Sequence, residues 1–368
     1  MKKKSFYILA LAALAVSCTN DELTTNETNA VVGFHALTSG VTTRAVNETN
    51  SVNLKDSPFD VYAFTETDGK LFIGKSLSES DYELSQGVEI RHNGSAWDYA
   101  NPADKAYWPT DKLNFFAFHP QPDPSNGYSV EVFSASKQVV RYSVPTNAKF
   151  QKDLMYAISR RVDKNTNAGK VKILFKHALS QACFKAKTEM ESMRVDVEDI
   201  KIHNFAVNGD LTLPQTGTDI SMKDWNTQEK KHITFEPKNL ETPVMEIGTE
   251  AKELTGKMYL PQELTKWTPD KYTIEQANKE KQSYLSVLCK IKQNGVYLWG
   301  SEEKAWRLFV PFGVKWEPGK RYVYTLIFGG GYKDDGTQVL DQIKWEVEEM
   351  PWQDAPYDVN ADTNVNVN

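Results

Sequence analysis

Few side chains of this sequence could do chemistry, and they are scattered along it. The histidines are six in number: His35, His92, His119, His177, His203 and His232. No two of them stand four residues apart, the spacing that places two zinc ligands on one face of a helix. No serine lies in a Gly-x-Ser-x-Gly turn, which holds the nucleophile of α/β-hydrolases. The sequence therefore predicts no metal site, no cofactor and no catalytic residues, and we do not expect an enzyme.

Carboxylates offer two further readings. Asp334 and Asp335 are adjacent, but calcium takes about six to eight oxygen ligands, so we interpret them as solvated turn residues. A carboxylate pair for sugar hydrolysis stays open, because acidic residues are abundant and their separation in space cannot be read from a sequence.

The cysteines indicate export rather than a disulfide scaffold. Cys18 follows a basic start at Lys2–Lys4, an uncharged apolar run from Phe6 to Val16, and the small residue Ser17. This pattern resembles a bacterial lipoprotein signal, with residues 1–17 removed and Cys18 lipidated at the outer membrane. The alternative is ordinary secretory cleavage after Ser17. The apolar run is shorter than the roughly 20 residues that cross a bilayer.

The two other cysteines, Cys183 and Cys289, are too few to form a disulfide scaffold, and their pairing is left open. Cys289 alternates with Leu285, Val287 and Ile291. This spacing favours a buried, inert thiol over a reactive one.

The elements that position these residues are predicted to be strands. Six segments are short, rich in aromatic and β-branched residues, and bounded by turn formers: 61–64, 113–118, 171–175, 284–291, 306–310 and 322–328. Turns are predicted at 67–70, 92–94, 207–210, 293–295 and 317–319, and the glycine run 329–331 is predicted to be a hairpin loop. Residues 273–282 are predicted to form a loop or a short helix. The fold class is therefore all-β, a β-sandwich.

Length and charge bound the organisation and the partners. The 368 residues suffice for two domains, and the polar stretch 162–169 is the expected linker. This gives a signal peptide at 1–17, a lipidated tether with a removable first strand at 18–44, an N-terminal β-sandwich at 45–165 and a C-terminal β-sandwich at 166–368. The net charge of -6 is spread out, without a basic run that could follow a phosphate backbone, so nucleic acid is excluded as a partner.

A strand precedes an isolated arginine near the start of the chain. Val32, Phe34 and Ala36 alternate on one face of the segment 31–37, and residues 38–45 then form a loop that carries the bond between Arg44 and Ala45. Exposed loops are the preferred sites of proteolysis. Cleavage after Arg44 is one interpretation of this segment, and an ordinary exposed residue in a tether is the other.

This N-terminal pattern resembles the fimbrillins, the Mfa-like subunits of type V pili. Other segments are similar to a recurring fimbrillin-like pattern in the same order: 106–109, 113–120, 153–157, 174–180, 260–262, 316–322 and 343–352. The resemblance spans nearly the whole chain.

The resemblance implies a fold, a maturation and a set of partners. It implies two tandem transthyretin-like β-sandwiches, lipidation at Cys18 and cleavage by an Arg-specific protease between Arg44 and Ala45. The first strand, with Val32, Phe34 and Ala36, then leaves, and a strand from another pilus subunit takes its place. It also implies a fimbrial location on the cell surface and cell adhesion, with host or bacterial surface ligands as further candidate partners.

The chain's end and its tryptophans complete the expectations. The tail from Pro356 to Asn368 is a weak candidate for a donor strand, and a frayed terminus is its alternative. The alternative function is a surface lipoprotein that binds glycans by stacking sugars on exposed tryptophans, for which there are four candidates: Trp97, Trp225, Trp267 and Trp299. We expect Trp108, Trp316 and Trp345 to belong to the core.

Overall fold

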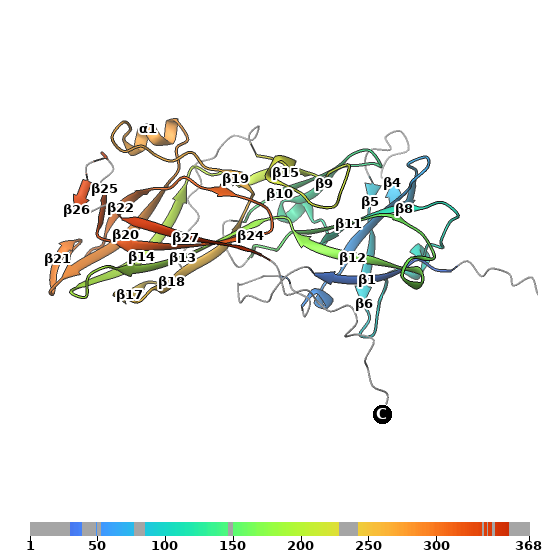
Figure 1. The fold of residues 1–368 in the computed structure, drawn as a ribbon, viewed down its shortest axis with the longest axis horizontal. Coiled ribbons are helices and arrows are strands. Elements are labelled where there is room, and N and C mark those ends of the chain that lie inside the picture. The colour runs from blue at the N-terminus through green and yellow to red at the C-terminus, as the bar shows by residue number, and fades with distance from the viewer. Residues whose placement is uncertain are drawn as a thin grey trace, which may run out of the picture.

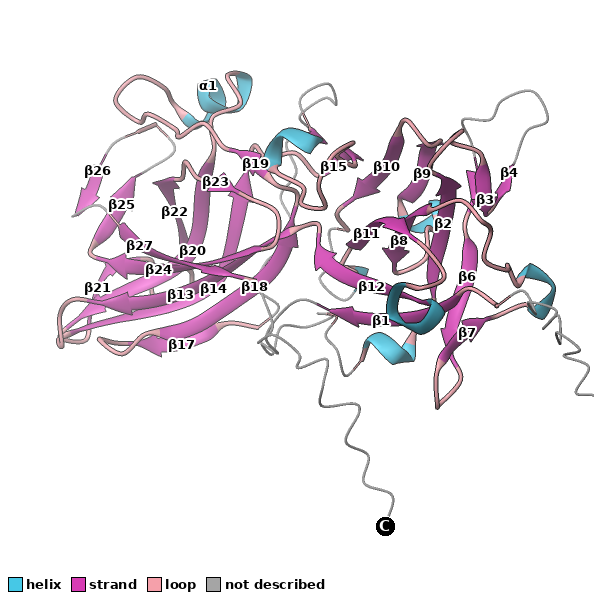
Figure 2. Cartoon of the chain, turned by 45° about the vertical axis from the view of Figure 1, so that its right-hand side comes forward, coloured by secondary structure: helices cyan, strands magenta, loops and turns pink. Residues whose placement is uncertain are grey.

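The fold is known from a computed structural model that describes residues 30–38, 49, 53–76, 85–145, 150–227, 242–332, 335–336, 338–340 and 343–352. The described chain folds mainly into strands joined by loops, as predicted for an all-β protein, and forms an elongated molecule with two lobes (Figures 1 and 2). Cys18, Arg44, Ala45 and the tail from Pro356 lie outside the described residues. No helix in the described ranges is long and apolar enough to span a membrane.

One lobe, on the right in Figure 1, contains an eight-stranded and a four-stranded sheet. The larger sheet has the order β3 (Leu71–Ile73), β2 (Phe59–Thr65), β6 (Val88–His92), β7 (Trp97–Tyr99), β1 (Gly33–Thr38), β12 (Lys170–His177), β11 (Met155–Val162) and β8 (Leu113–His119). Because β2 also pairs with β8, this sheet closes on itself. The smaller sheet has the order β16 (Trp225–Asn226), β15 (Asn208–Thr212), β10 (Gln138–Ser143) and β9 (Tyr128–Phe133).

The other lobe is a sandwich of a four-stranded and a seven-stranded sheet. The first has the order β18 (Lys252–Tyr259), β13 (Ser180–Thr188), β24 (Lys320–Phe328) and β27 (Lys344–Pro351). The second has the order β17 (Val244–Ile247), β14 (Met193–His203), β20 (Tyr284–Gln293), β22 (Trp306–Pro311), β25 (Gly330–Tyr332) and β26 (Gln338–Leu340), with β21 (Val296–Trp299) paired to β20.

The remaining described elements are small. Two-stranded pairs join β19 (Gln262–Glu263) to β23 (Lys315–Trp316) and β4 (Lys75–Ser76) to β5 (Ser85–Gln86). The helix α1 (Ile274–Lys279) falls where a loop or short helix was expected, and the Thr273 hydroxyl caps it by accepting the Gln276 N–H. Short 3₁₀ turns lie at Leu54–Asp56, Pro102–Asp104, Pro124–Asn126, Thr166–Gly169 and Met222–Asp224.

Burial on both faces explains why β2 and β8 read as continuous apolar runs. Val61 of β2 and Phe115 of β8 point into the closed sheet, while Tyr62 and Phe116 face the four-stranded sheet. These two strands therefore form a middle layer between two cores. A third core fills the sandwich of the other lobe, and Cys289 is fully buried there with Leu285, Val287 and Ile291, as their alternation predicted.

The expected division of the chain does not coincide with the sheets. The segment 162–169 begins with the last residue of β11, includes the 3₁₀ turn Thr166–Gly169 and leads into β12, and β11 and β12 are paired in one sheet. The strands β12, β15 and β16 follow residue 165 in the chain but belong to the sheets of the first lobe. The boundary between 45–165 and 166–368 stays a prediction, because sheet pairing alone does not define folding units.

Two predicted turns are wrong. Asn208 and Gly209 lie within β15, which pairs with β10. A Cβ at Gly209 would come within 3.1 Å of side-chain atoms of Leu260 and Trp225, so close packing and not a chain reversal favours glycine here. Gly330 and Gly331 belong to β25, which pairs with β26. In contrast, Asn294 and Gly295 form the predicted hairpin turn, with φ of 50° and 81°.

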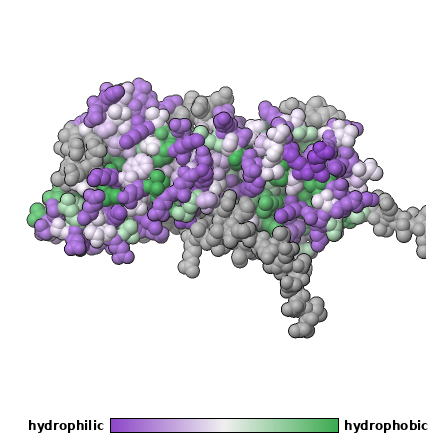
Figure 3. Space-filling view, viewed as in Figure 1, coloured by the Kyte–Doolittle hydropathy of each residue, from purple (hydrophilic) through white to green (hydrophobic). Residues whose placement is uncertain are grey.

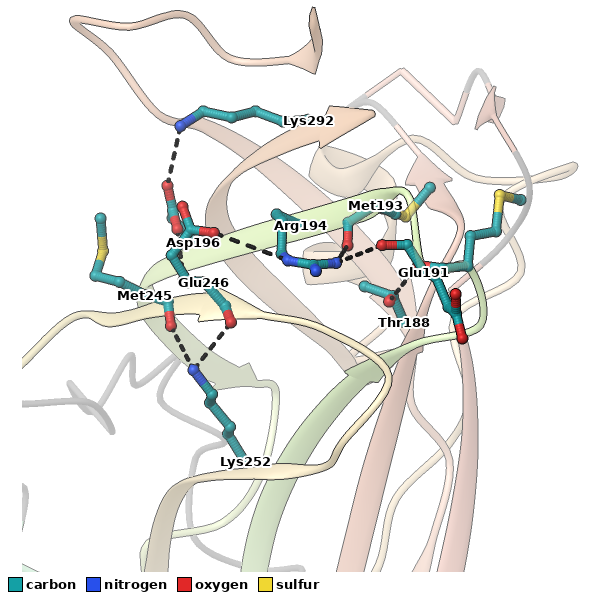
Figure 4. Close-up of polar contacts among 10 residues, drawn as sticks. Thr188, Glu191, Met193, Arg194, Asp196, Met245, Glu246, Lys252 and Lys292 are labelled. Atoms are coloured by element: carbon teal, nitrogen blue, oxygen red, sulfur yellow. Dashed lines mark hydrogen bonds and ion pairs between the residues drawn. The ribbon is translucent and has the colours of Figure 1, made fainter. Parts of the chain in front are cut away.

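A polar network secures the short strand β17 at the far end of the second lobe (Figure 4). Lys252 donates to the backbone oxygens of Met245 and Glu246, at 2.9 Å each. The Glu246 N–H donates to the Asp196 carboxylate at 2.8 Å, and the Arg194 guanidinium donates to the backbone oxygens of Glu191 and Met193. The Asp196 bond holds β17 against β14, although a register shift interrupts their pairing, and the Lys252 bonds hold β17 against β18.

The first lobe also contains a carboxylate whose burial has a pH signature. Asp60 on β2 accepts a hydrogen bond from the Gln121 side chain at 2.6 Å, and burial raises the pKa of Asp60 from 3.8 to about 6. The folded protein therefore binds a proton more tightly at Asp60 than the unfolded chain does. The charged form at neutral pH makes folding less favourable.

We predict that Asp60→Asn stabilises the protein above pH 6 and not at pH 4. A pKa difference of about two units corresponds to up to about 3 kcal/mol at pH 7.5, and the amide oxygen still accepts from Gln121. Urea unfolding at both pH values measures this difference. Equal effects of the substitution at pH 4 and pH 7.5 would contradict it.

Candidate functional site

The candidate site is the slot that β1 occupies between β12 and β7. β1 runs parallel to β12 over six residue pairs, from Gly33 opposite Lys170 to Thr38 opposite Phe175. On its other edge it pairs with β7 at a single position, Phe34 opposite Trp97. A strand from near the start of the chain thus lies inside the sheet, held firmly along one edge and lightly along the other.

The three predicted inward side chains of β1 are buried. Val32, Phe34 and Ala36 are 0%, 4% and 6% exposed and belong to the core of the closed sheet. The Phe34 ring lies edge-on to the rings of Tyr99 and Phe115, at centroid distances of 5.4 and 6.5 Å. The slot therefore has an aromatic pocket in its middle and accommodates a small side chain at Ala36.

Backbone hydrogen bonds hold the entry to β1. The Val32 N–H donates to the backbone oxygen of Ala106, and the Trp108 N–H donates to the backbone oxygen of Ala30, each at 2.9 Å. The Tyr99 hydroxyl donates to the backbone oxygen of Val32 at 3.1 Å. The segment 106–109, singled out in the sequence, is thus part of the slot's wall.

A buried carboxylate anchors the chain just after the predicted cleavage bond. Asp153 accepts the Thr49 N–H at 3.0 Å and contacts His177 Nδ1 at 2.9 Å, and the Asp153 and His177 side chains are 0% and 2% exposed. The Trp352 ring is stacked on the His177 ring with a centroid distance of 4.1 Å and an angle of 4°. This cluster, which we call the Asp153 anchor, connects residues near both ends of the described chain.

The segment that carries Arg44 therefore runs between two fixed points. Thr38, at the end of β1, is 3% exposed, and Thr49 is 9% exposed and bound to the Asp153 anchor. Only residues 39–48 connect them in the sequence, with Arg44 near the middle.

A second buried histidine in this lobe, His119, contacts the Ser57 hydroxyl at 3.1 Å. Burial lowers the pKa of His119 to about 4, so its ring is neutral at pH 7.

The tryptophans expected to stack on sugars are buried. Trp97, Trp225, Trp267 and Trp299 are between 1% and 8% exposed. Three of their indole N–H groups donate to backbone oxygens: Trp225 to Ala178, Trp267 to Tyr272 and Trp299 to Trp306. The prediction of an exposed tryptophan platform is therefore wrong, because long-range packing covers residues that lie next to turns in the sequence. Trp108 and Trp316 are buried, as predicted, and Trp345 packs against the core of the second lobe.

Reactive chemistry finds little support in the described residues. Ser286 and His203 form a contact of 2.8 Å like that of a nucleophile and its base, a pair the sequence did not reveal because they lie on neighbouring strands. Ser286 is fully buried and also accepts a hydrogen bond from Arg307, so no substrate reaches it. Burial raises the pKa of the Cys289 thiol, and neither Cys183 nor Cys289 is in a disulfide. Within the described ranges, no group of three or more His, Cys, Asp or Glu could hold a metal ion.

Comparison with known proteins identifies the class. The family model described as fimbrillin-like matches residues 43–350, so the chain belongs to the fimbrillin-like family. This is a family of cell-surface fimbrial components, and the protein is a structural pilus protein rather than an enzyme. No curated protein has significant sequence similarity to the chain.

Similarity to solved structures concerns the fold alone. A fimbrial protein from Bacteroides vulgatus is 12% identical, with a TM-score of 0.58, and the match covers 88% of this chain and 100% of that one. The tip fimbrial protein Mfa3 from Porphyromonas gingivalis is 10% identical, with a TM-score of 0.35 and coverage of 87% and 99%. The fimbrial anchor protein Mfa2 from the same organism is 11% identical, with a TM-score of 0.32 and coverage of 87% and 99%. Of these three, the first is close enough to argue a common fold.

We predict that Asp153→Ala destabilises the protein by about 3 kcal/mol, because it removes the buried acceptor of two hydrogen bonds. Urea unfolding measures the loss. Glu275→Ala is the matched control, since its ion pair with Lys279 is exposed on α1, and it should leave the midpoint almost unchanged. Equal midpoints for the two variants would show that the Asp153 anchor contributes nothing particular.

Proposed function

We propose that this protein is a pilus subunit that is exported as a lipoprotein and assembled by strand exchange. In this proposal Cys18 receives the lipid, an Arg-specific protease cuts between Arg44 and Ala45, and β1 then leaves its slot. A strand from another subunit enters the slot and supplies the missing backbone pairing, which is β-augmentation. The outer membrane is the partner of the lipid, and host or bacterial surface ligands are the partners of the assembled pilus.

The observation that carries this proposal is the contrast between β1 and β13. Both strands pair in parallel with a strand much later in the chain, β1 with β12 and β13 with β24. β13 is also paired at seven positions with β18 on its other edge, whereas β1 is paired at one with β7. The parallel strand is thus paired along both edges in the second lobe, and mainly along one edge in the first. A strand whose pairing lies mainly along one edge is the one suited to exchange.

The burial energy of β1 indicates how much stability the lobe would lose if β1 left after cleavage. Full burial of Val32 and Phe34 contributes about 1.5 to 3 kcal/mol each, and a domain has a total stability of about 5 to 15 kcal/mol. While β1 belongs to the same chain, its docking needs no association from solution. Cleavage ends this advantage, and the open slot then exposes apolar side chains and unpaired backbone groups that favour a new strand.

The alternative, a glycan-binding lipoprotein that uses exposed tryptophans, has lost its structural basis. Its candidate tryptophans belong to the cores of the two lobes. The tail from Pro356 onward stays a weak candidate for the donor strand, as its sequence suggested.

The processing step is tested first at the N-terminus of protein recovered from the surface of its native host. We expect mass spectrometry to find wild-type chains that begin at Ala45, whereas Arg44→Ala chains keep an acylated Cys18. Wild-type chains that keep an acylated Cys18 throughout the assembled fimbriae would contradict cleavage as the assembly signal. Thr43→Ala is the matched control, since it leaves the arginine in place.

The slot itself is tested with a peptide in trans. After cleavage of the purified full-length protein at Arg44, a synthetic peptide of residues 31–38 should bind and raise the melting temperature. The peptide with Phe34→Asp should bind at least tenfold more weakly, because it places a charge in the pocket formed by Tyr99 and Phe115. The control peptide carries His35→Thr, on the opposite face of the strand. Equal binding of all three peptides would show that side chains do not select the strand.

A further inference from the structure

A polar cleft lies on the side of the molecule that carries α1 and β19, away from the slot of β1. Its volume is about 860 Å³, within the range of about 300 to 1,000 Å³ typical of ligand sites. Figures 1 and 2 place β19 between α1 and β15, so the cleft lies where the two lobes meet. Its walls come from three segments, residues 222–227, 261–265 and 280–281, together with Asn204.

Two backbone positions in this cleft have the left-handed conformation. Asn204 and Lys281 both have positive φ, 60° and 55°, and both line the cleft. Hydrogen bonds hold these conformations: the Asn204 side chain donates to the Gln282 oxygen at 2.6 Å, and the Lys281 N–H donates to the Asn278 oxygen at 3.3 Å. Lys281 directly follows the C-cap of α1, where a left-handed residue commonly ends a helix, and asparagine adopts this conformation readily. These hydrogen-bonded turns fix the shape of the cleft wall.

The polar side chains of the cleft divide into two groups. Gln262 and Asn204 are engaged within the protein, since Gln262 bonds the backbone of Ala206 in both directions and Asn204 bonds Asn278. The others make no side-chain hydrogen bond or ion pair with the described residues: Lys223, Asn226, Thr227, Glu263, Thr265, Glu280 and Lys281. Asn226 and Glu263 are exposed, so their side chains are accessible to a ligand.

The composition of the walls selects the kind of ligand. Two lysines and two glutamates cancel in charge, which disfavours a strongly anionic or cationic partner. The amide and the hydroxyls add neutral donors and acceptors at short spacing, and Pro261 and Leu264 supply apolar surface between them. A ligand that matches this mixture is uncharged, carries many hydroxyl groups and has apolar C–H faces.

We propose that this cleft binds a neutral carbohydrate. Recognition rests on hydrogen bonds from the cleft's amide, hydroxyl and carboxylate groups to sugar hydroxyls, and not on an exposed tryptophan platform. The site is independent of strand exchange, because none of its lining residues belongs to β1, β7 or β12. A pilus subunit with this cleft would be an adhesin as well as a building unit.

The test uses the full-length protein on a printed array of plant, microbial and mucin oligosaccharides. We expect retention on at least one neutral glycan, and Asn226→Ala and Glu263→Ala each weaken that binding by about tenfold, the effect of losing one hydrogen bond. The matched control is Glu253→Ala, an exposed glutamate on β18 outside the cleft. Saturation-transfer NMR with the retained oligosaccharide then measures contacts at its C–H groups.

Three results overturn the proposal. The first is the absence of binding to any glycan on the array by protein whose circular dichroism and melting temperature are those of the folded chain. The second is glycan binding that Asn226→Ala, Glu263→Ala and the filling variant Asn226→Trp leave unchanged. The third is retention of charged glycans alone, because the cleft has no net charge.

Discussion

The first lobe depends on the placement of one short strand from near the start of the chain. β1 lies in a sheet that closes through the pairing of β2 with β8, so each strand of the ring has a neighbour on both sides. The pairing of β1 with β7 is limited to one position. Val32, Phe34 and Ala36 complete the core that Val61, Phe115 and Ile173 begin. A closed sheet has no free edge, and therefore loss of β1 creates two edges and an uncovered core at once. The same feature that stabilises the lobe makes it responsive to the removal of a single segment.

The second lobe is a reference for how the first could have been built. Its β13 lies in an equivalent parallel position and contributes Ala182, Phe184 and Ala186 to a core, as β1 does. Its full pairing with β18 makes it an integral part of its sandwich. The two lobes therefore differ in how the second edge of this strand is paired: β13 pairs with β18 at seven positions, and β1 pairs with β7 at one. Six parallel pairs with β12 hold β1 in the sheet. Removal of β1 would break fewer backbone pairs on the other edge than removal of β13 would.

Sequence patterns predicted the local structure well and the long-range packing poorly. Alternation identified the inward face of β1 and the buried thiol of Cys289, because a strand's side chains alternate whatever it packs against. The pair Asn294–Gly295 reverses the chain. The pair Asn208–Gly209 does not, because Gly209 lies in a strand and packs closely against Trp225 and Leu260, which come much later in the sequence. The tryptophans next to predicted turns are buried for the same reason, because residues distant in sequence cover them. The cleft walls and the contact of Ser286 with His203 also join distant segments, which no local pattern records.

The contacts of the Asp153 anchor lie outside the part of the chain that the proposed cleavage at Arg44 would release. The anchor binds Thr49, which follows the scissile bond, and carries Trp352 on the ring of His177. His177 belongs to β12, the strand that lines the slot, but lies beyond the last residue paired with β1. The anchor's contacts are thus made by residues that follow the Arg44–Ala45 bond in the sequence and lie outside β1. In the proposed exchange, removal of β1 would therefore leave the contacts of Thr49, Asp153, His177 and Trp352 unbroken.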